Sequence, residues 1–196
     1  MRKFQWLNES GIKEEGNRLT LKAPARTDIF NFGMKLGADG IPEDSVHNAP
    51  FYYTLVKGDF VLKARVSLKF VSDYDAGALL FMQDLKTWVK LAFEQTDFGT
   101  RAVVSVVTRV HSDDANGCNI EGETVWLQMA RAGDHFALHY SLDGERYDMV
   151  RVFRLKAART LKVGLLAQSP LGEGGDRVFE HVSLEERTIG NLRSGV

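Results

Sequence analysis

The sequence predicts an all-β protein, folded as a sandwich or a barrel. Short runs that alternate apolar and polar residues recur from one end of the chain to the other, and turn residues separate them. No long window holds the apolar stripe of a helix, which disfavours a parallel β-α-β fold. With 196 residues and no linker or repeat to divide it, the chain is expected to form one domain over residues 1–196.

The individual strands follow from this alternation. Gly58–Phe70 is the clearest, because apolar side chains from Phe60 to Phe70 alternate with charged or hydroxyl side chains, which gives one core face and one solvated face. The same reasoning predicts further strands at Phe4–Leu7, Arg18–Lys22, Ala76–Gln83, Trp88–Glu94, Ala102–Arg109, Thr124–Arg131, His135–Ser141, Tyr147–Arg154, Thr160–Gln168 and Arg177–Glu186.

Glycine-containing pairs mark the reversals between strands. Gly58-Asp59, Gly133-Asp134 and Asp143-Gly144 are expected at hairpins, where glycine readily adopts a positive φ angle. Two runs, Gly77–Met82 and Ala102–Val107, are almost continuously apolar, so they are expected to be central strands that are covered on both faces.

Two less regular stretches are expected to be loops. Asn31–Pro50 is interrupted by glycines and prolines, which predicts a long loop along one rim of the sandwich. Ser112–Glu123 carries some ligand positions of an EF-hand calcium loop, but Ser112 stands where the first aspartate is required. This second stretch is therefore interpreted as a polar rim loop.

The strand Trp88–Glu94 carries the candidate site. Alternate side chains of a strand point to opposite faces, so one face of this segment is plain core. The other face presents an aromatic ring, a cation and a carboxylate in a row: Trp88, Lys90 and Glu94. If this strand lies beside one or both of the apolar strands, its polar row sits centrally on a sheet. Such a row has the chemistry to bind a sugar or another polar ligand.

Composition excludes several functional classes. Lys and Arg number 25 and Asp and Glu 26, so the net charge of −1 gives no electrostatic case for nucleic-acid binding. Cys118 is the single cysteine, which excludes an intrachain disulfide and a thiol-rich metal site. The chain shows neither the apolar run of a signal peptide nor that of a membrane span. We therefore expect a cytoplasmic protein with no membrane association and no metal or other cofactor.

The order of several short motifs resembles domain-of-unknown-function family 1349, the regulation-of-enolase-like group of the concanavalin A-like lectin and glucanase superfamily. The resemblance covers about residues 50–180. Its motifs are Gly58-Asp59-Phe60, Asp75-Ala76-Gly77, Trp88-Val89-Lys90 with Glu94, Ser105-Val106-Val107, Ser112-Asp113, Arg131-Ala132-Gly133-Asp134, Tyr140-Ser141-Leu142-Asp143-Gly144, Arg151 and Ser169-Pro170.

The resemblance implies a two-sheet antiparallel jelly roll whose concave sheet binds or cleaves glycans. The motif residues that could face this groove are Asp75, Trp88, Lys90, Glu94, Ser112, Asp113 and Arg151. Trp88 would stack on a sugar ring, the carboxylates would accept hydroxyl hydrogen bonds, and the cations would donate. In the family an aromatic residue often follows the Ser-Asp pair, whereas this chain has Asp114 there.

Three functional hypotheses follow. The first is binding of a carbohydrate or another small polar ligand on the concave sheet. The plainer alternatives are that Trp88 is a core residue and that Lys90 and Glu94 form an ion pair with each other. The second is a glycoside hydrolase, which needs a second acid near Glu94; because Ala92 and Thr96 occupy the alternate positions, Asp75 or Asp84 would have to supply it. The third is a protein-interaction or metabolic regulatory module. The histidines form no metal motif and are expected at the surface or rim.

Overall fold

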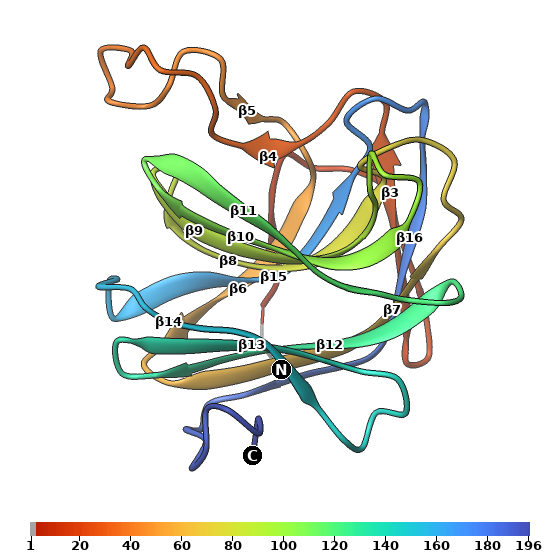
Figure 1. Cartoon of the computed structure of the whole chain (residues 1–196), viewed down its shortest axis with the longest axis vertical. Helices are drawn as coiled ribbons and strands as arrows, with labels where there is room; N and C mark the ends of the chain where they lie inside the picture. The colour runs from red at the N-terminus through yellow and green to blue at the C-terminus, as the bar shows by residue number, and fades with distance from the viewer. Residues whose placement is uncertain (1–2) are drawn as a thin grey trace.

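In the computed structural model, which describes residues 3–196, the chain forms two seven-stranded antiparallel sheets packed face to face (Figure 1). Met1 and Arg2 of the predicted domain lie outside the described residues. The first sheet has the spatial order β1 (Gln5–Leu7), β6 (Phe51–Lys57), β15 (Thr160–Gln168), β8 (Ala76–Asp84), β9 (Thr87–Gln95), β10 (Arg101–Arg109) and β11 (His111–Asn119). The second has the order β14 (Asp148–Arg154), β13 (His135–Ser141), β12 (Thr124–Ala132), β7 (Phe60–Leu68), β16 (Gly174–Glu185), β3 (Arg18–Pro24) and β2 (Ile12–Glu15). The predicted all-β sandwich is confirmed.

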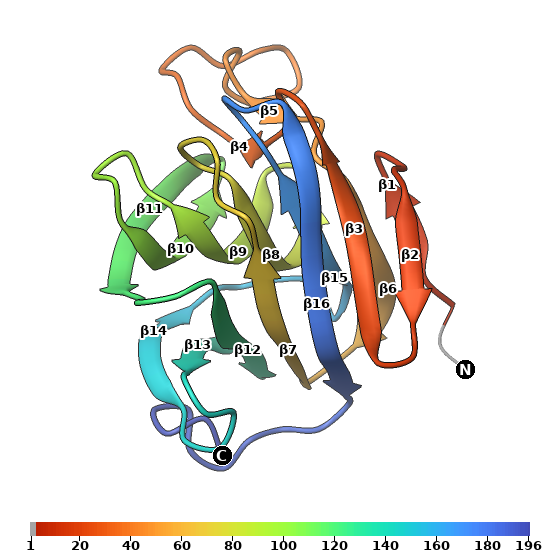
Figure 2. The ribbon, with the colours of Figure 1, turned by 90° about the vertical axis from the view of Figure 1, so that its right-hand side faces the viewer.

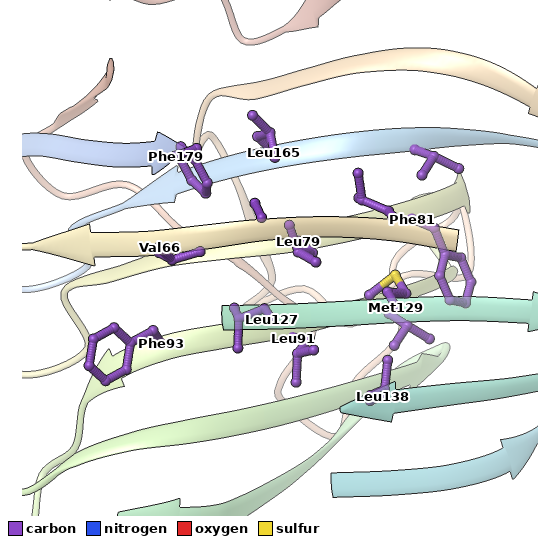
Figure 3. Close-up of a cluster of buried hydrophobic side chains, with 14 of the residues drawn as sticks. Val66, Leu79, Phe81, Leu91, Phe93, Leu127, Met129, Leu138, Leu165 and Phe179 are labelled. Atoms are coloured by element: carbon purple, nitrogen blue, oxygen red, sulfur yellow. The ribbon is translucent and has the colours of Figure 1, made fainter. Parts of the chain in front are cut away.

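The core lies between the two sheets, where one face of each contributes large apolar side chains (Figure 3). Phe81 of β8 stacks on Phe136 of β13 with ring centroids 4.4 Å apart, which joins the sheets near the middle of the sandwich. Leu79, Leu91 and Leu165 of the first sheet pack in the same cluster as Val66, Leu127 and Phe179 of the second. Strand alternation therefore places the intervening side chains of β8, β9 and β10 on the outer face of the first sheet.

Most predicted strands are confirmed. β9 lies between the two continuously apolar strands, β8 and β10, and all three are buried on both faces. The glycines of the three predicted reversals, Gly58, Gly133 and Gly144, all have positive φ angles. The predicted rim loop at Ser112–Glu123 is wrong over most of its length, because β11 occupies residues 111–119 as an edge strand. β2 and β6 were not predicted.

A third layer covers part of the outer face of the first sheet. In Figure 1, β8 to β11 form a curved part of the first sheet, and β4 (Ile29–Phe30) and β5 (Val46–His47) lie over it. We call residues 27–50 the strap. A second apolar cluster fills the space beneath it, with Ile29 and Ala49 of the strap packed on side chains such as Leu80, Trp88, Val104 and Val106. The predicted loop at Asn31–Pro50 therefore does more than follow a rim, since its ends cross the concave face.

Asn31 fixes the strap to the sheet. Its side-chain amide donates to Leu85 O and Val110 O, both at 2.8 Å, and its carbonyl oxygen lies 2.7 Å from His47 Nε2. Its backbone N–H donates to Ser112 Oγ at 2.9 Å. Asn31 is fully buried, so these bonds form away from solvent and hold the strap against two hairpin ends.

The C-terminal segment, residues 186–196, covers the outer face of the second sheet. Ile189 packs on Val61 and Ala130. His139 Nε2 lies 2.9 Å from Leu192 O, and Gln128 Nε2 donates to Gly195 O at 2.9 Å. Figure 2 shows this segment at the end of the molecule opposite β4 and β5. His139 is completely buried, so the expectation of surface histidines is wrong at this position.

Candidate functional site

The polar row of β9 lies on the outer face of the first sheet, at its centre. Lys90 pairs in register with Leu80 of β8 and Val106 of β10, and Glu94 pairs with Ala76 and Ala102. These neighbours are apolar, so the two charged side chains rise from an otherwise apolar floor. The predicted central position of the row is confirmed.

Lys90 is almost fully buried, with 2% of its surface exposed. Its ammonium group donates to Gln168 Oε1 at 2.7 Å, Asp28 Oδ1 at 3.1 Å and Ile29 O at 3.1 Å. An ammonium group has three protons, so these acceptors use all of them. Lys90 clamps the strap to the sheet and pairs with Asp28; among the described ion pairs there is none with Glu94. No proton remains for donation to a ligand, so the predicted donor role of Lys90 is wrong.

Glu94 lies beside this clamp and is also buried, with 7% of its surface exposed. Gln168 connects the two, because its Oε1 accepts from Lys90 while its Nε2 lies 3.5 Å from Glu94 Oε2. Burial raises the pKa of Glu94 to about 8; Lys90 opposes this rise, and the charge of Asp114 adds to it. At neutral pH Glu94 therefore holds a proton, so its carboxyl group can both donate and accept hydrogen bonds.

A pocket of about 330 Å³ opens above these side chains. Its floor comes from the sheet and its wall from the strap and from the loop before β8; the lining residues are Asp28, Phe30, Phe32, Tyr74, Lys90, Glu94, Val104, Val106, Asp114 and Gln168. Asp114 enters from β11, where it pairs with Val106, and burial raises the pKa of its carboxyl group despite the opposing charge of Lys90. The strap therefore narrows the concave face to a pocket without closing it.

Two predicted ligand residues lie on this face but are not available to a ligand. Trp88 has no exposed surface and belongs to the apolar cluster under the strap, so the expected stacking role is wrong and the core interpretation holds. Its Nε1 is buried without a hydrogen-bond partner. Ser112 Oγ accepts from Asn31 N and lies 2.9 Å from Thr108 Oγ1, so this hydroxyl anchors the strap.

Asp75 lies outside the pocket. It is fully buried against the second sheet, where Oδ1 accepts from Arg177 Nη2 at 2.9 Å and from Ser169 Oγ at 2.6 Å. Its other oxygen accepts from two backbone amides of the loop before it. Asp75 is thus a structural ion-pair residue, and its predicted ligand-binding and catalytic roles are wrong.

The remaining predicted residues lie elsewhere. Asp113 points to the opposite face of β11 from Asp114 and accepts from Arg151 Nη2 of β14 at 3.1 Å, which joins the edges of the two sheets outside the pocket. Asp84 is the last residue of β8, next to the turn that leads to β9, and accepts from Lys86 N. It pairs with Thr87, seven residues from Glu94 along β9, or roughly 23 Å at about 3.3 Å per residue. Asp84 cannot act together with Glu94.

Several pocket residues were not predicted. Gln168 had a usable signal, because it is an amide at the end of an apolar predicted strand and alternates with Leu166. Asp28, Phe30 and Phe32 had none, since the strap shows no periodicity and its position depends on long-range contacts. Tyr74 precedes β8 in a left-handed conformation, φ 66°, which the sequence does not indicate.

Among residues 3–196, no group of three or more His, Cys, Asp or Glu side chains is placed to hold a metal ion. Over the same range, no helix has the length and apolar character needed to span a membrane.

A curved sheet of a two-sheet sandwich, with a polar and aromatic pocket on its hollow side, defines a fold of the concanavalin A-like lectin and glucanase type. The chain belongs to the family described as protein of unknown function (DUF1349), whose profile matches residues 6–187. The family resemblance seen in the sequence is confirmed. No curated protein matches the sequence.

Solved structures support the same fold. A functionally unknown protein from Saccharomyces cerevisiae has a TM-score of 0.81 and 23% identity, over 94% of this chain and 96% of the other. The carbohydrate-binding module CBM66 from Bacillus subtilis has a TM-score of 0.57 and 13% identity, over 92% and 94% of the two chains. The GH43 BlXynB protein from Bacillus licheniformis has a TM-score of 0.62 and 10% identity; the match covers 87% of this chain but only 33% of that protein. At these identities the likeness concerns the fold alone.

Proposed function

We propose that the pocket under the strap binds a neutral polyhydroxyl ligand, best fitted by one residue of a carbohydrate. The observation that carries this proposal is the convergence of Glu94, Gln168 and Asp114 with the rings of Phe30, Phe32 and Tyr74 around one small pocket. Carboxyl and amide groups match sugar hydroxyls, and aromatic rings match the C–H faces of a pyranose. The volume of about 330 Å³ lies near the lower end of small-molecule sites, about 300–1,000 Å³.

The charge balance of the pocket favours a neutral ligand. Lys90 is neutralised by Asp28 and has no free proton for an anion. Glu94 is protonated at neutral pH, because its pKa is about 8, so it offers no charge to a cation. Asp114, which is exposed, also lines the pocket, and its carboxyl group can accept hydroxyl hydrogen bonds. Sugar-related neighbours in the structural comparison add support to a carbohydrate ligand.

The test uses two adjacent residues of β11 that point to opposite faces. We expect calorimetric or NMR titration with neutral mono- and oligosaccharides to detect binding, and Asp114→Ala to weaken it at least about tenfold, since a hydrogen bond to a charged group contributes about 1.5–3 kcal/mol. Asp113→Ala is the matched control, because Asp113 pairs with Arg151 outside the pocket. Absence of binding to every sugar tested, or equal losses in both variants, would contradict the proposal.

Glycoside hydrolysis is a second candidate, favoured by one observation. A buried carboxylic acid with a pKa of about 8 is protonated at neutral pH, which is the state required of a general acid. The partner carboxylate would be Asp114 or Asp28 of the same pocket. If the wild type releases reducing sugar during the titrations and Glu94→Gln does not, the function is hydrolysis and not binding alone.

The interaction-module hypothesis would instead use the exposed Phe32, Met34 and Leu36 of the strap.

A further inference from the structure

The pocket continues past Glu94 into a second hollow. This outer hollow measures about 390 Å³ and is lined by Tyr74, Glu94, Thr96, Asp97, Phe98, Asp114 and Asn116. Three of these residues, Tyr74, Glu94 and Asp114, also line the pocket under the strap. The two hollows therefore meet at these side chains and form one trough, with the strap at one end and the turn between β9 and β10 at the other.

The turn between β9 and β10 presents an exposed aromatic ring at the outer end of the trough. Phe98 lies in this turn and is 77% exposed. A single exposed apolar side chain is common on protein surfaces. Phe98 differs because it borders a polar hollow and sits on a turn whose conformation is fixed.

Thr96 fixes that turn. Its backbone N–H donates to Thr100 O at 2.7 Å, its carbonyl accepts from Gly99 N at 3.1 Å, and its hydroxyl lies 2.8 Å from the hydroxyl of Thr100. The same hydroxyl accepts from Phe98 N at 3.3 Å. Gly99 has a φ of 72°, which a glycine adopts without strain. The Phe98 ring is therefore held by an ordered backbone, so ligand binding carries no free-energy cost for ordering this loop.

The remaining walls of the outer hollow are polar. Tyr74 and Asp97 come from two loops that face each other across the trough; burial raises the pKa of the Tyr74 hydroxyl, and the nearby Asp97 carboxylate adds to the rise. The backbone of Tyr74 is held by a hydrogen bond from its N–H to Gln95 O at 2.7 Å. Asn116 contributes an amide from β11, and its backbone pairs with Val104 beside the inner pocket. One apolar ring among hydroxyl, amide and carboxylate groups again matches a sugar residue.

We propose that the outer hollow is a second subsite that binds the next residue of an oligosaccharide, with Phe98 as its stacking platform. This inference rests on the proposed function of the inner pocket and specifies its ligand class: a chain of at least two linked sugar rings, one on each side of Glu94. A monosaccharide occupies the inner pocket alone. A longer ligand contacts both hollows, and its affinity gains from Phe98 and Asn116.

The experiment compares ligand lengths by calorimetric titration. The probes are glucose, cellobiose and cellotriose, and xylose, xylobiose and xylotriose. We expect the trisaccharide of at least one series to bind about tenfold more tightly than its monosaccharide, and Phe98→Ala to remove most of that gain, because the Phe98 ring supplies the stacking contact of the outer subsite. Phe98→Tyr should retain the gain, and Asn116→Ala should reduce it with Phe98 intact.

Leu142→Ala is the control, because Leu142 is similarly exposed, at 73%, but lies in the turn after β13 of the other sheet. Monosaccharide affinity should change less than about twofold in every variant, a difference within roughly 0.4 kcal/mol. If trisaccharides bind no more tightly than monosaccharides, or if Phe98→Ala weakens both equally, the outer subsite is refuted and the inner site stands. If no probe binds, the proposed function and this inference fail together.

Discussion

At the scale of single residues, burial decides which polar groups of the first sheet can meet a ligand. Lys90 and Asp75 were both predicted to bind one, yet each pairs with an opposite charge of the protein, Asp28 and Arg177 respectively. The sequence shows residue type and face but not partners, which come from segments 62 and 102 residues away. Glu94 was predicted correctly as a pocket residue because strand alternation alone places it there.

The protonation of Glu94 gives a prediction for stability. Its folded pKa of about 8 lies above the unfolded value of 4.5, so its contribution to stability is complete below pH 4.5 and declines as the pH rises towards 8. Glu94→Gln, which imitates the protonated acid, should therefore be more stable than the wild type at pH 9 by at least about 1.4 kcal/mol, the equivalent of one pKa unit. Urea denaturation at pH 6 and pH 9 measures this difference.

Glu9→Gln, which removes an exposed carboxylate, is the control and should keep the wild-type pH dependence. Equal pH dependence in the wild type and Glu94→Gln would mean that Glu94 is ionised in the folded protein at neutral pH. The charge argument for a neutral ligand would then lose its support.

At the scale of elements, the alternating strands were predictable and the strap was not. β7 to β10 carry clean patterns because each has at least one face in the core. β11, with the sequence HSDDANGCN, has few apolar residues since it is an edge strand with most side chains exposed. The strap contains only two short strands, and its position depends on Lys90 and Asn31, whose partners are distant in sequence.

Asn31 offers a test of how the strap is held. Asn31→Ala removes three side-chain hydrogen bonds and leaves Leu85 O and Val110 O buried without this donor. Because an unsatisfied buried group costs about 1–3 kcal/mol, we expect a loss of about 2–3 kcal/mol in the free energy of unfolding. Limited proteolysis should also become faster between residues 32 and 45.

Asn48→Ala is the matched control within the same strap. Asn48 makes two hydrogen bonds of similar length, at 2.9 Å, to Asp28 N and Arg26 O, but it is exposed, so water replaces them. Its loss of stability should stay below about 1 kcal/mol. Similar losses in the two variants would show that the burial of Asn31 contributes nothing.

At the scale of the whole molecule, each sheet has its outer face covered by a segment without regular structure over most of its length. The strap covers the first sheet at one end, and residues 186–196 cover the second at the other (Figure 2). Both covers are fastened by buried polar side chains of the sheet: Lys90 for the strap, and Gln128 with His139 for the C-terminal segment. Polar side chains that point to the outer face of a central strand thus predict that another segment of the chain covers that face.

His139 makes the second cover sensitive to acid. Burial lowers the pKa of His139 below 6.5, and Lys63 adds to this effect. Its contribution to stability is therefore complete above pH 6.5 and is lost as the pH falls towards the lower folded pKa. Between pH 7.5 and pH 5 the wild type should lose more stability than His139→Gln, as measured by urea denaturation. His135→Gln, at an exposed position of the same strand, should behave like the wild type.

The anchoring of the strap also has an evolutionary consequence. Asp28, Asn31 and His47 fasten its two ends, while residues 33–45 between them form none of these anchoring contacts. Surface loops tolerate insertions and substitutions far better than the strands that carry them. Relatives could therefore lengthen or shorten this loop, and so remodel the mouth of the pocket, without altering the sheet, the clamp or Glu94.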